Sequence, residues 1–253
     1  MVKTSTSDRS PLSPTRSPDT GFVWWQSLLF AVLLLVAMYV PATILLAFLI
    51  VAGWAHLKDL QSLSWPLLIA QLCAYAATLA VILPLLPRLA QRTLPRLGLR
   101  APQLRDVALA IAGAIVMFVA SVAAGAAEQA IFHLKPDEVQ VQLLRAARGP
   151  TIGVFVFFAC VAAPFVEELT FRGFIFNALR RYLPVWVAVP GSAILFGLAH
   201  WQPGNAGAIL PLAAAGAVLA LVYYRSGSLV ASMLTHAIFN SVTVVLVVVF
   251  HQA

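Results

Sequence analysis

Charged residues are scarce in this sequence. Only 10% of the 253 residues are Asp, Glu, Lys or Arg, whereas 61% are hydrophobic. Soluble globular domains carry about 25% charged residues, and a single core of this size could not hide so much apolar surface. The low charge therefore excludes an ordinary soluble domain and indicates a protein of the lipid bilayer.

Cysteine, alternating polarity and internal repeats are also lacking. The two cysteines, Cys73 and Cys160, fall inside apolar stretches, which argues against a disulfide framework or a thiolate metal site. No ten-residue segments of alternating hydrophobicity suggest an outer-membrane barrel, so membrane-crossing segments should be helices. The missing repeat removes a signature that many transporters share.

Seven apolar windows remain as candidate membrane spans, since about 20 helical residues cross roughly 30 Å of hydrocarbon. They predict an all-α fold, a polytopic membrane helix bundle of about seven transmembrane helices, and leave an eighth crossing open. The fifth window is notably short. The windows are 24–52, 64–87, 107–132, 152–178, 185–200, 207–224 and 228–250.

The rest of the chain divides simply. Residues 1–21, rich in Ser, Thr and Pro, are expected to form a disordered cytoplasmic tail. They do not resemble a signal peptide, because the apolar stretch that follows is too long and no small-residue cleavage site closes it. Residues 22–253 would form the helical transmembrane domain. Within it, segment 133–150 predicts either a short amphipathic helix at the interface or an ordinary loop.

Basic residues are distributed unevenly, and the net charge is +7. A cytoplasmic N-terminus would put eleven Lys and Arg on the cytoplasmic side and four on the other, the asymmetry that orients membrane proteins. We therefore expect a multi-pass protein of the cell membrane, with the lipid bilayer as its environment. The chain has no basic stripe with interleaved aromatic residues, which argues against nucleic acid as a partner. The eleven are Lys3, Arg9, Arg16, Arg88, Arg92, Arg96, Arg100, Arg105, Arg180, Arg181 and Arg225, and the four are Lys58, Lys135, Arg145 and Arg148.

Three charged residues interrupt the fourth window, in the segment PFVEELTFRGF, 164–174. An ionised residue at the centre of a span costs about 2.5–3.5 kcal/mol on insertion scales, so such residues are rare and usually functional. Glu168 and Arg172 are four residues apart, hence they share a helix face and can form an ion pair. Glu167 is turned about 100° from Glu168 and needs a partner on another helix.

Two histidines in other apolar windows are candidate partners of Glu167. LFGLAHW puts Phe196 and His200 on one face at the end of the fifth window, and LTHAIFN puts His236 and Asn240 on one face of the seventh. A lone membrane histidine more often bonds two helices together. With Glu167, however, two imidazoles and a carboxamide can activate water and stabilise an oxyanion. Glu167, His200 and His236 could instead hold one divalent metal such as zinc.

These residues form three motifs, EELTFR, FGLAH and HAIFN, which fit Glu-Glu-x-x-x-Arg, Phe-x-x-x-His and His-x-x-x-Asn. In order and approximate spacing they resemble the CAAX prenyl protease and bacteriocin-processing family (CPBP, or Abi) of intramembrane proteases. The resemblance covers about 150–245, which would be the catalytic core. It implies hydrolysis of a peptide bond in a membrane-associated or prenylated protein or peptide by activated water, with no covalent intermediate. Prokaryotic relatives are linked to peptide maturation and bacteriocin immunity.

The resemblance also implies a role for each residue. Glu167 would be the general base and His200 would assist it. His236 and Asn240 would form the oxyanion hole, while Glu168 and Arg172 would hold the geometry of the site. No His-Glu-x-x-His helix is present, so the chain is not a zincin. We favour the mechanism without a metal and keep the alternative of one divalent cation.

Two other function classes remain open on the sequence. Intramembrane Glu, Arg and His can form the relay of a transporter or channel, and a noncatalytic immunity or scaffold protein could keep the motifs for folding. The straight-helix picture also separates His200, at the end of its window, from Glu167 near the middle of the fourth. Their meeting requires a tilted or shallow fifth span, an inward-dipping segment HWQPGNAG, 200–207, or different span boundaries. Glu128 is expected to be exposed at the interface.

Overall fold

The computed structural model describes residues 24–57, 59, 63–90, 97–134, 139–147, 149–201 and 206–250. The expected tail, 1–21, lies outside these ranges. The described residues contain helices and no strand, and they include six helices that are long and apolar enough to cross a membrane. The predicted polytopic helical bundle is therefore confirmed. The six are α1 (Trp24–Val51), α2 (Trp65–Ala90), α3 (Leu104–Phe132), a composite helix (Thr151–Tyr182), α9 (Ile209–Ser226) and α10 (Leu229–Phe250).

A seventh apolar helix, α8 (Val185–Ala199), has only 15 residues and corresponds to the short fifth window. Two smaller helical pieces accompany the spans: α4 (Val139–Ala146) and a 3-10 turn at Ala206–Ala208. α4 lies in the segment for which a helix or a loop was expected. It buries Leu144 and leaves Arg145 exposed, as an amphipathic helix does.

The composite helix changes its winding along its length. Two stretches have the wider π-helical turn, which often marks a functional site. The first ends just before Pro164, whose ring cannot donate a backbone hydrogen bond and would crowd a regular turn. The pieces are α5 (Thr151–Phe157), a π-helix at Phe158–Ala162, α6 (Ala163–Glu168), a π-helix at Leu169–Phe176 and α7 (Asn177–Tyr182).

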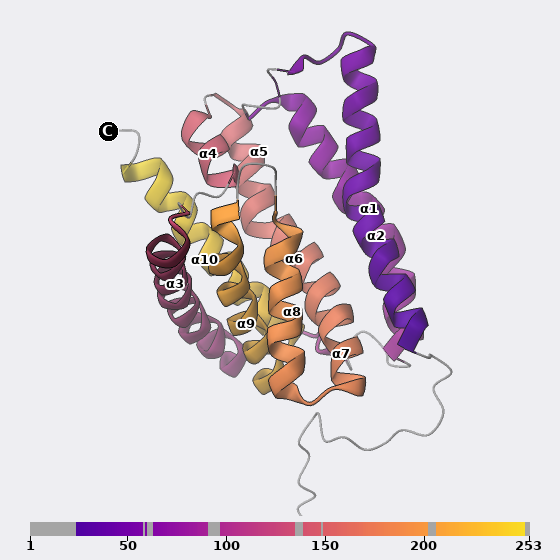
Figure 1. Cartoon of the computed structure of the whole chain (residues 1–253), viewed down its shortest axis with the longest axis vertical. Helices are drawn as coiled ribbons and strands as arrows, with labels where there is room; N and C mark the ends of the chain where they lie inside the picture. The colour runs from indigo at the N-terminus through magenta and orange to yellow at the C-terminus, as the bar shows by residue number, and fades with distance from the viewer. Residues whose placement is uncertain are drawn as a thin grey trace, which may run out of the picture.

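The helices pack as neighbouring hairpins. α1 packs on α2 at one side of the molecule, α8 packs on α9, and α3 packs on both α9 and α10. α2 in turn touches the middle pieces of the composite helix. Figure 1 shows the α1–α2 pair standing beside the group formed by α3 and α6 to α10. The composite helix thus lies between the α1–α2 pair and the other spans.

The turn between α7 and α8 explains how His200 reaches Glu167. The fourth window was expected to end at residue 178, but the composite helix continues to Tyr182, and only residues 183–184 separate it from α8. Glu167 and His200 each lie about 16 residues from this turn, or roughly 24 Å along each arm. They are therefore level, and the separation expected from the sequence was wrong because the span boundary was placed too early.

Small residues let α8 approach α9 closely. A Cβ atom added at Gly197 would lie 2.5 Å from the carbonyl oxygen of Ile209, and one at Gly216 would lie 3.1 Å from Cβ of Phe196. At Gly191, by contrast, an added Cβ atom would meet only a side-chain methyl of Leu179 at 3.4 Å. Gly197 and Gly216 therefore set the spacing of the two helices.

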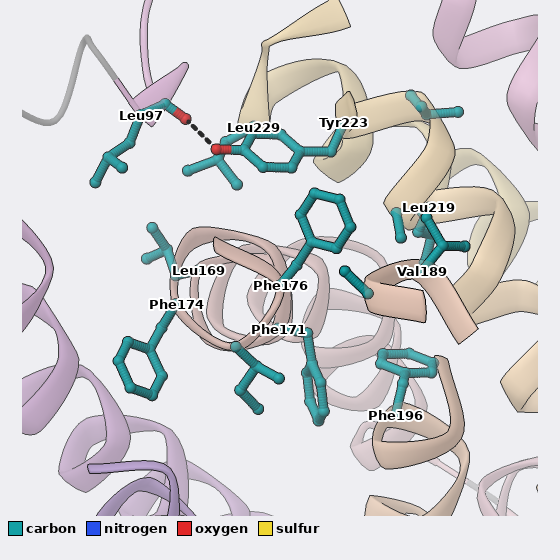
Figure 2. Close-up of a cluster of buried hydrophobic side chains, with 14 of the residues drawn as sticks. Leu97, Leu169, Phe171, Phe174, Phe176, Val189, Phe196, Leu219, Tyr223 and Leu229 are labelled. Carbon is teal, nitrogen blue, oxygen red and sulfur yellow. Dashed lines mark hydrogen bonds between the residues drawn. The ribbon is translucent and has the colours of Figure 1, made fainter. Parts of the chain in front are cut away.

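The core forms around these contacts. Figure 2 shows the rings of Phe171 and Phe196 facing each other across the gap between the composite helix and α8, with centroids 5.0 Å apart in an edge-to-face arrangement. The Tyr223 hydroxyl donates to the carbonyl oxygen of Leu97 at 3.2 Å (Figure 2). The core thus joins helix faces and also ties the segment before α3 to α9.

The turns expected to be cytoplasmic meet at one end of the bundle, where α7 ends in Figure 1. Nη2 of Arg105 bonds the Arg225 carbonyl oxygen at 3.4 Å, and the Arg180 guanidinium lies 5.6 Å from the centre of the Tyr224 ring. Leu229 N–H donates to the carbonyl oxygen of Gly98 at 3.0 Å. The orientation of this basic end toward the cytoplasm stays a prediction.

The close approach of α8 and α9 predicts the effect of Gly197→Ala. The added methyl group collides with backbone atoms of α9, so we expect a loss of about 1–3 kcal/mol of stability, as for other overpacked sites. Gly153→Ala is the matched control, since Gly153 is helical and a Cβ there meets nothing within 4 Å. Thermal unfolding of the purified variants in one detergent measures both. Equal midpoints for the two variants would contradict the packing argument.

Candidate active site

The centre of the site is a buried ion pair. Nη1 of Arg172 donates to Oε1 of Glu168 at 2.9 Å, and both side chains have 0% exposure. The pairing follows from the i, i+4 spacing on one helix. Within a membrane, pairing of this kind removes two charges that lipid could not solvate.

Arg172 also holds the neighbouring hairpin. Its Nη2 donates to the carbonyl oxygen of Gly216 on α9 at 2.7 Å, and its guanidinium carbon lies 4.7 Å from the centre of the Phe196 ring on α8. The cation therefore receives a carboxylate, a carbonyl and the face of an aromatic ring. One side chain thus links the composite helix to both α8 and α9.

Glu168 completes its bonding with two residues of α10. Nδ1 of His236 lies 3.1 Å from Oε1 and the hydroxyl of Ser232 donates to Oε2 at 2.5 Å. Because a carboxylate only accepts, Nδ1 of His236 must carry the hydrogen. Sequence reasoning missed Ser232, although it lies four residues before His236 and so shares its helix face.

His236 turns its other nitrogen to Glu167. Its Nε2 lies 4.0 Å from Oε2 of Glu167, and Nε2 of His200 lies 3.7 Å from the same oxygen. Nδ1 of His200 donates to the Phe196 carbonyl oxygen at 2.8 Å, which leaves the Nε2 lone pair free in the neutral ring. The structure therefore brings Glu167, His200 and His236 together from three helices.

Glu167 differs from its neighbour in having no direct partner. Its Oε2 is buried and forms no hydrogen bond with the described residues, although its side chain as a whole remains 12% exposed. Distances of 3.7 and 4.0 Å exceed a direct hydrogen bond, and a polar contact of this length is one that water can bridge. Two adjacent carboxylates thus have opposite surroundings, one saturated with donors and one open.

Asn240 lies one turn beyond His236 and is fixed by the backbone of the composite helix. Its Nδ2 donates to the carbonyl oxygen of Ala159 at 2.7 Å. The π-helical turn sends the Ala163 N–H to Phe158, and Pro164 has no N–H to offer. The Ala159 carbonyl therefore lacks its usual helix donors, and Asn240 supplies one.

Glu167, His200 and His236 are also the suggested ligands of a divalent metal. No group of three or more His, Cys, Asp or Glu side chains is placed to hold a metal ion in the part of the chain that the structure describes. Both histidine Nδ1 atoms are engaged by protein oxygens, an orientation that metal-binding histidines also adopt. The orientation of the two rings therefore fits both water activation and metal binding.

Three residues of the surroundings differ from expectation or were not foreseen. Glu128 is only 4% exposed, so the expectation of interfacial exposure was wrong. α9 begins against the end of α3, and the Leu210 N–H donates to Oε1 of Glu128 at 3.4 Å. Tyr39 of α1 and Tyr75 of α2 lie within electrostatic range of Glu167. No pattern in the sequence singles out these tyrosines, because their relation to Glu167 arises only from helix packing.

Comparison with known proteins agrees with these motifs. The family described as Type II CAAX prenyl endopeptidase Rce1-like matches residues 149–242. The protein named "Putative membrane peptidase YdiL", from Bacillus subtilis (strain 168), is 26% identical over 178 residues, which cover 68% of this chain and 69% of that protein. No solved structure matches the chain.

The family match spans the three motifs that the structure gathers around Glu167, from the composite helix to α10. The related membrane protein extends the similarity well beyond them. Over residues 149–242 the chain is therefore similar to the Rce1-like CAAX prenyl endopeptidases, which supports the resemblance to the CAAX prenyl protease and bacteriocin-processing (CPBP) family.

Proposed function

We propose that this protein is an intramembrane endopeptidase that hydrolyses a peptide bond with water activated by Glu167. The observation that carries the proposal is the open carboxylate of Glu167, which faces Nε2 of both His200 and His236. A buried carboxylate without a donor is costly. A bound water between these groups removes that cost and is also the reagent that hydrolysis needs.

Glu167 acts as the general base in this mechanism. It takes a proton from the water as the water oxygen attacks the carbonyl carbon of the substrate. His200 assists, because its Nε2 lone pair accepts a hydrogen bond from the same water while the Phe196 carbonyl fixes the ring. The proton then passes to the leaving amine when the tetrahedral intermediate breaks down, and no covalent enzyme intermediate forms.

Asn240 and His236 stabilise the oxyanion of that intermediate. One Asn240 N–H is held by Ala159, and this bond aims the second N–H of the same amide. Nε2 of His236 carries a proton only in the imidazolium form, because Nδ1 already donates to Glu168. The Glu168 carboxylate, 3.1 Å from Nδ1 of His236, offsets the positive charge of the imidazolium.

Glu168 and Arg172 have a supporting role. Every contact described for Glu168 fixes another element of the site: Arg172 on its own helix, and His236 and Ser232 on α10. Both its oxygens already accept from protein donors and its side chain has 0% exposure, so Glu168 is not placed to take the proton of a water molecule. Because the two carboxylates differ in this way, we assign the role of general base to Glu167 and the supporting role to Glu168.

The substrate is a protein or peptide that reaches the site from the bilayer. Glu167, His200 and His236 lie on membrane-crossing or apolar helices, so a substrate with a membrane-associated or prenylated end can approach them within lipid. The basic end of the bundle faces the cytoplasm in this proposal, as the distribution of Lys and Arg favours.

The base assignment predicts that Glu167→Gln abolishes cleavage. We expect a loss of at least about 10²-fold, the lower range for general base catalysis, with normal folding because the amide has the same shape. The assay uses protein in lipid vesicles with a farnesylated CAAX-type peptide, and mass spectrometry detects the products. Glu128→Gln is the matched control, a second buried carboxylate outside the site. Unchanged cleavage by Glu167→Gln would refute the mechanism.

The supporting role of Arg172 predicts that Arg172→Met lowers the stability of the protein, which Glu167→Gln should not do. Removing one partner of a buried ion pair leaves the other charge unpaired, which costs about 3–5 kcal/mol. We expect a markedly lower unfolding midpoint for Arg172→Met in detergent, whereas Glu167→Gln keeps the midpoint of the parent protein. Equal stability of the two variants would show that the pair does not support the fold.

A mechanism based on these side chains alone predicts resistance to chelators. The purified protein should keep its cleavage rate after treatment with EDTA and 1,10-phenanthroline, and elemental analysis should find no stoichiometric zinc. A zinc-dependent peptidase treated in parallel shows that the chelators act. Stoichiometric metal whose removal abolishes cleavage, with recovery on adding zinc back, would establish the metal alternative instead.

A further inference from the structure

His200 is presented by the last turn of α8, so the geometry of that turn decides where its ring points. A helix leaves its last four carbonyl groups without intrahelical donors. In α8 these belong to residues 196–199. Each carbonyl that found no other donor would be an unpaired acceptor inside the membrane, where it costs several kcal/mol.

Three of the four carbonyls are bonded within the turn itself. Phe196 accepts from Nδ1 of His200. Gly197 accepts from the backbone N–H of His200 at 3.1 Å, and Leu198 accepts from the N–H of Trp201 at 3.0 Å. The carbonyl of Ala199 is the fourth, and its donor comes from a distant part of the chain.

That donor is the hydroxyl of Tyr39, in the middle of α1. Tyr39 and Ala199 are 160 residues apart in the sequence. Leu34 and Ala37, just before Tyr39, are buried, whereas Ile44 and Phe48 beyond it are exposed at 64% and 56%. Tyr39 is itself 43% exposed, so its hydroxyl joins α1 to the end of α8 from the margin of the bundle, beside the two buried positions Leu34 and Ala37.

The bond lies beside the reacting groups. Tyr39 is within electrostatic range of Glu167, and its acceptor immediately precedes His200. The hydroxyl hydrogen is used by the Ala199 carbonyl, so it is not directed at the substrate or at the water. The donor of Tyr39 is thus committed to the turn that carries His200.

We propose that Tyr39 is a positioning residue, which caps the final carbonyl of α8 and so holds His200 with Nε2 toward Glu167. The proposal rests on the role of His200 in the proposed function. It makes α1, which lies outside the three motifs, a functional part of the site. Without the hydroxyl, the Ala199 carbonyl must find another donor, and the turn that carries His200 can rearrange.

The first test observes His200 directly and needs no substrate. The protein is labelled with ¹⁵N-histidine in lipid bilayers and examined by solid-state NMR, with the His200 signals assigned from the spectrum of His200→Gln. We expect one tautomer with hydrogen on Nδ1 in the parent protein, and a mixture of tautomers or broadened signals in Tyr39→Phe. His236 serves as the internal reference and should not change.

The matched control is Thr43→Val, which removes a hydroxyl one turn along α1. The Thr43 hydroxyl donates to the Tyr39 carbonyl of its own helix at 2.9 Å and reaches no other helix. The His200 signals of the Thr43→Val variant should match those of the parent protein. His200 signals in Tyr39→Phe that are identical to those of the parent would overturn the proposal.

The second test is a double-mutant cycle with the farnesylated peptide. A lost hydrogen bond of about 1 kcal/mol should lower kcat several-fold to tenfold in Tyr39→Phe and leave KM unchanged. In a His200→Ala background the same substitution should cost nothing more, because the group that it positions is gone. An equal loss in both backgrounds would mean that Tyr39 stabilises the fold generally, and would overturn the proposal. If the parent protein does not cleave the peptide, the proposed function fails and the NMR test still decides the role of Tyr39.

Discussion

The structure depends on one constraint, which is that a charge inside a membrane must be neutralised by a partner and by hydrogen bonds. The Glu168–Arg172 pair meets it with contacts to four elements: its own helix, Phe196 on α8, Gly216 on α9 and two residues of α10. An apolar core would hold these helices as well or better, since buried ion pairs seldom add net stability. The pair instead favours one arrangement, because its contacts reach all four elements at once; among the described residues, Nε of Arg172 has no hydrogen-bond partner.

Irregular helix geometry also helps to hold the helices together through polar contacts. A regular α-helix pairs its backbone groups internally, so a neighbour can reach only a second lone pair of a carbonyl, as Arg172 does at Gly216. The π-helical turn before Pro164 frees the carbonyl of Ala159, and the end of α8 frees that of Ala199. Asn240 and Tyr39 bond these two groups from other helices. Broken helices thus provide polar attachment points at membrane depth, where irregular backbone is tolerated if protein covers it.

Features that depend on one helix could be predicted from the sequence, whereas features that depend on which helices are neighbours could not. The spans and the Glu168–Arg172 pairing follow from composition and from the 3.6-residue period, which involve one helix at a time. The depth of His200 in the bundle was misjudged because it depends on where the fourth span ends. That span ends at Tyr182, four residues later than predicted. Ser232, Tyr39 and the burial of Glu128 were missed or wrong because each depends on which helices become neighbours. The motifs indicated which side chains meet, but Ser232 and Tyr39, which bond to Glu168 and to the turn before His200, lie outside them.

The two adjacent glutamates show how a membrane protein can keep one reactive group. Consecutive residues on a helix point about 100° apart, so two carboxylates at 167 and 168 necessarily face different surroundings. Glu168 faces α9 and α10 and meets three donors, which occupy both its oxygens. Glu167 faces the lone pairs of two imidazoles, which cannot donate to it unless they are protonated. Its charge is tolerable because the paired Arg172 lies one turn away and because water can enter between the rings. The different surroundings of the two carboxylates thus follow from this rotation, and the order Glu-Glu-x-x-x-Arg places both on one helix.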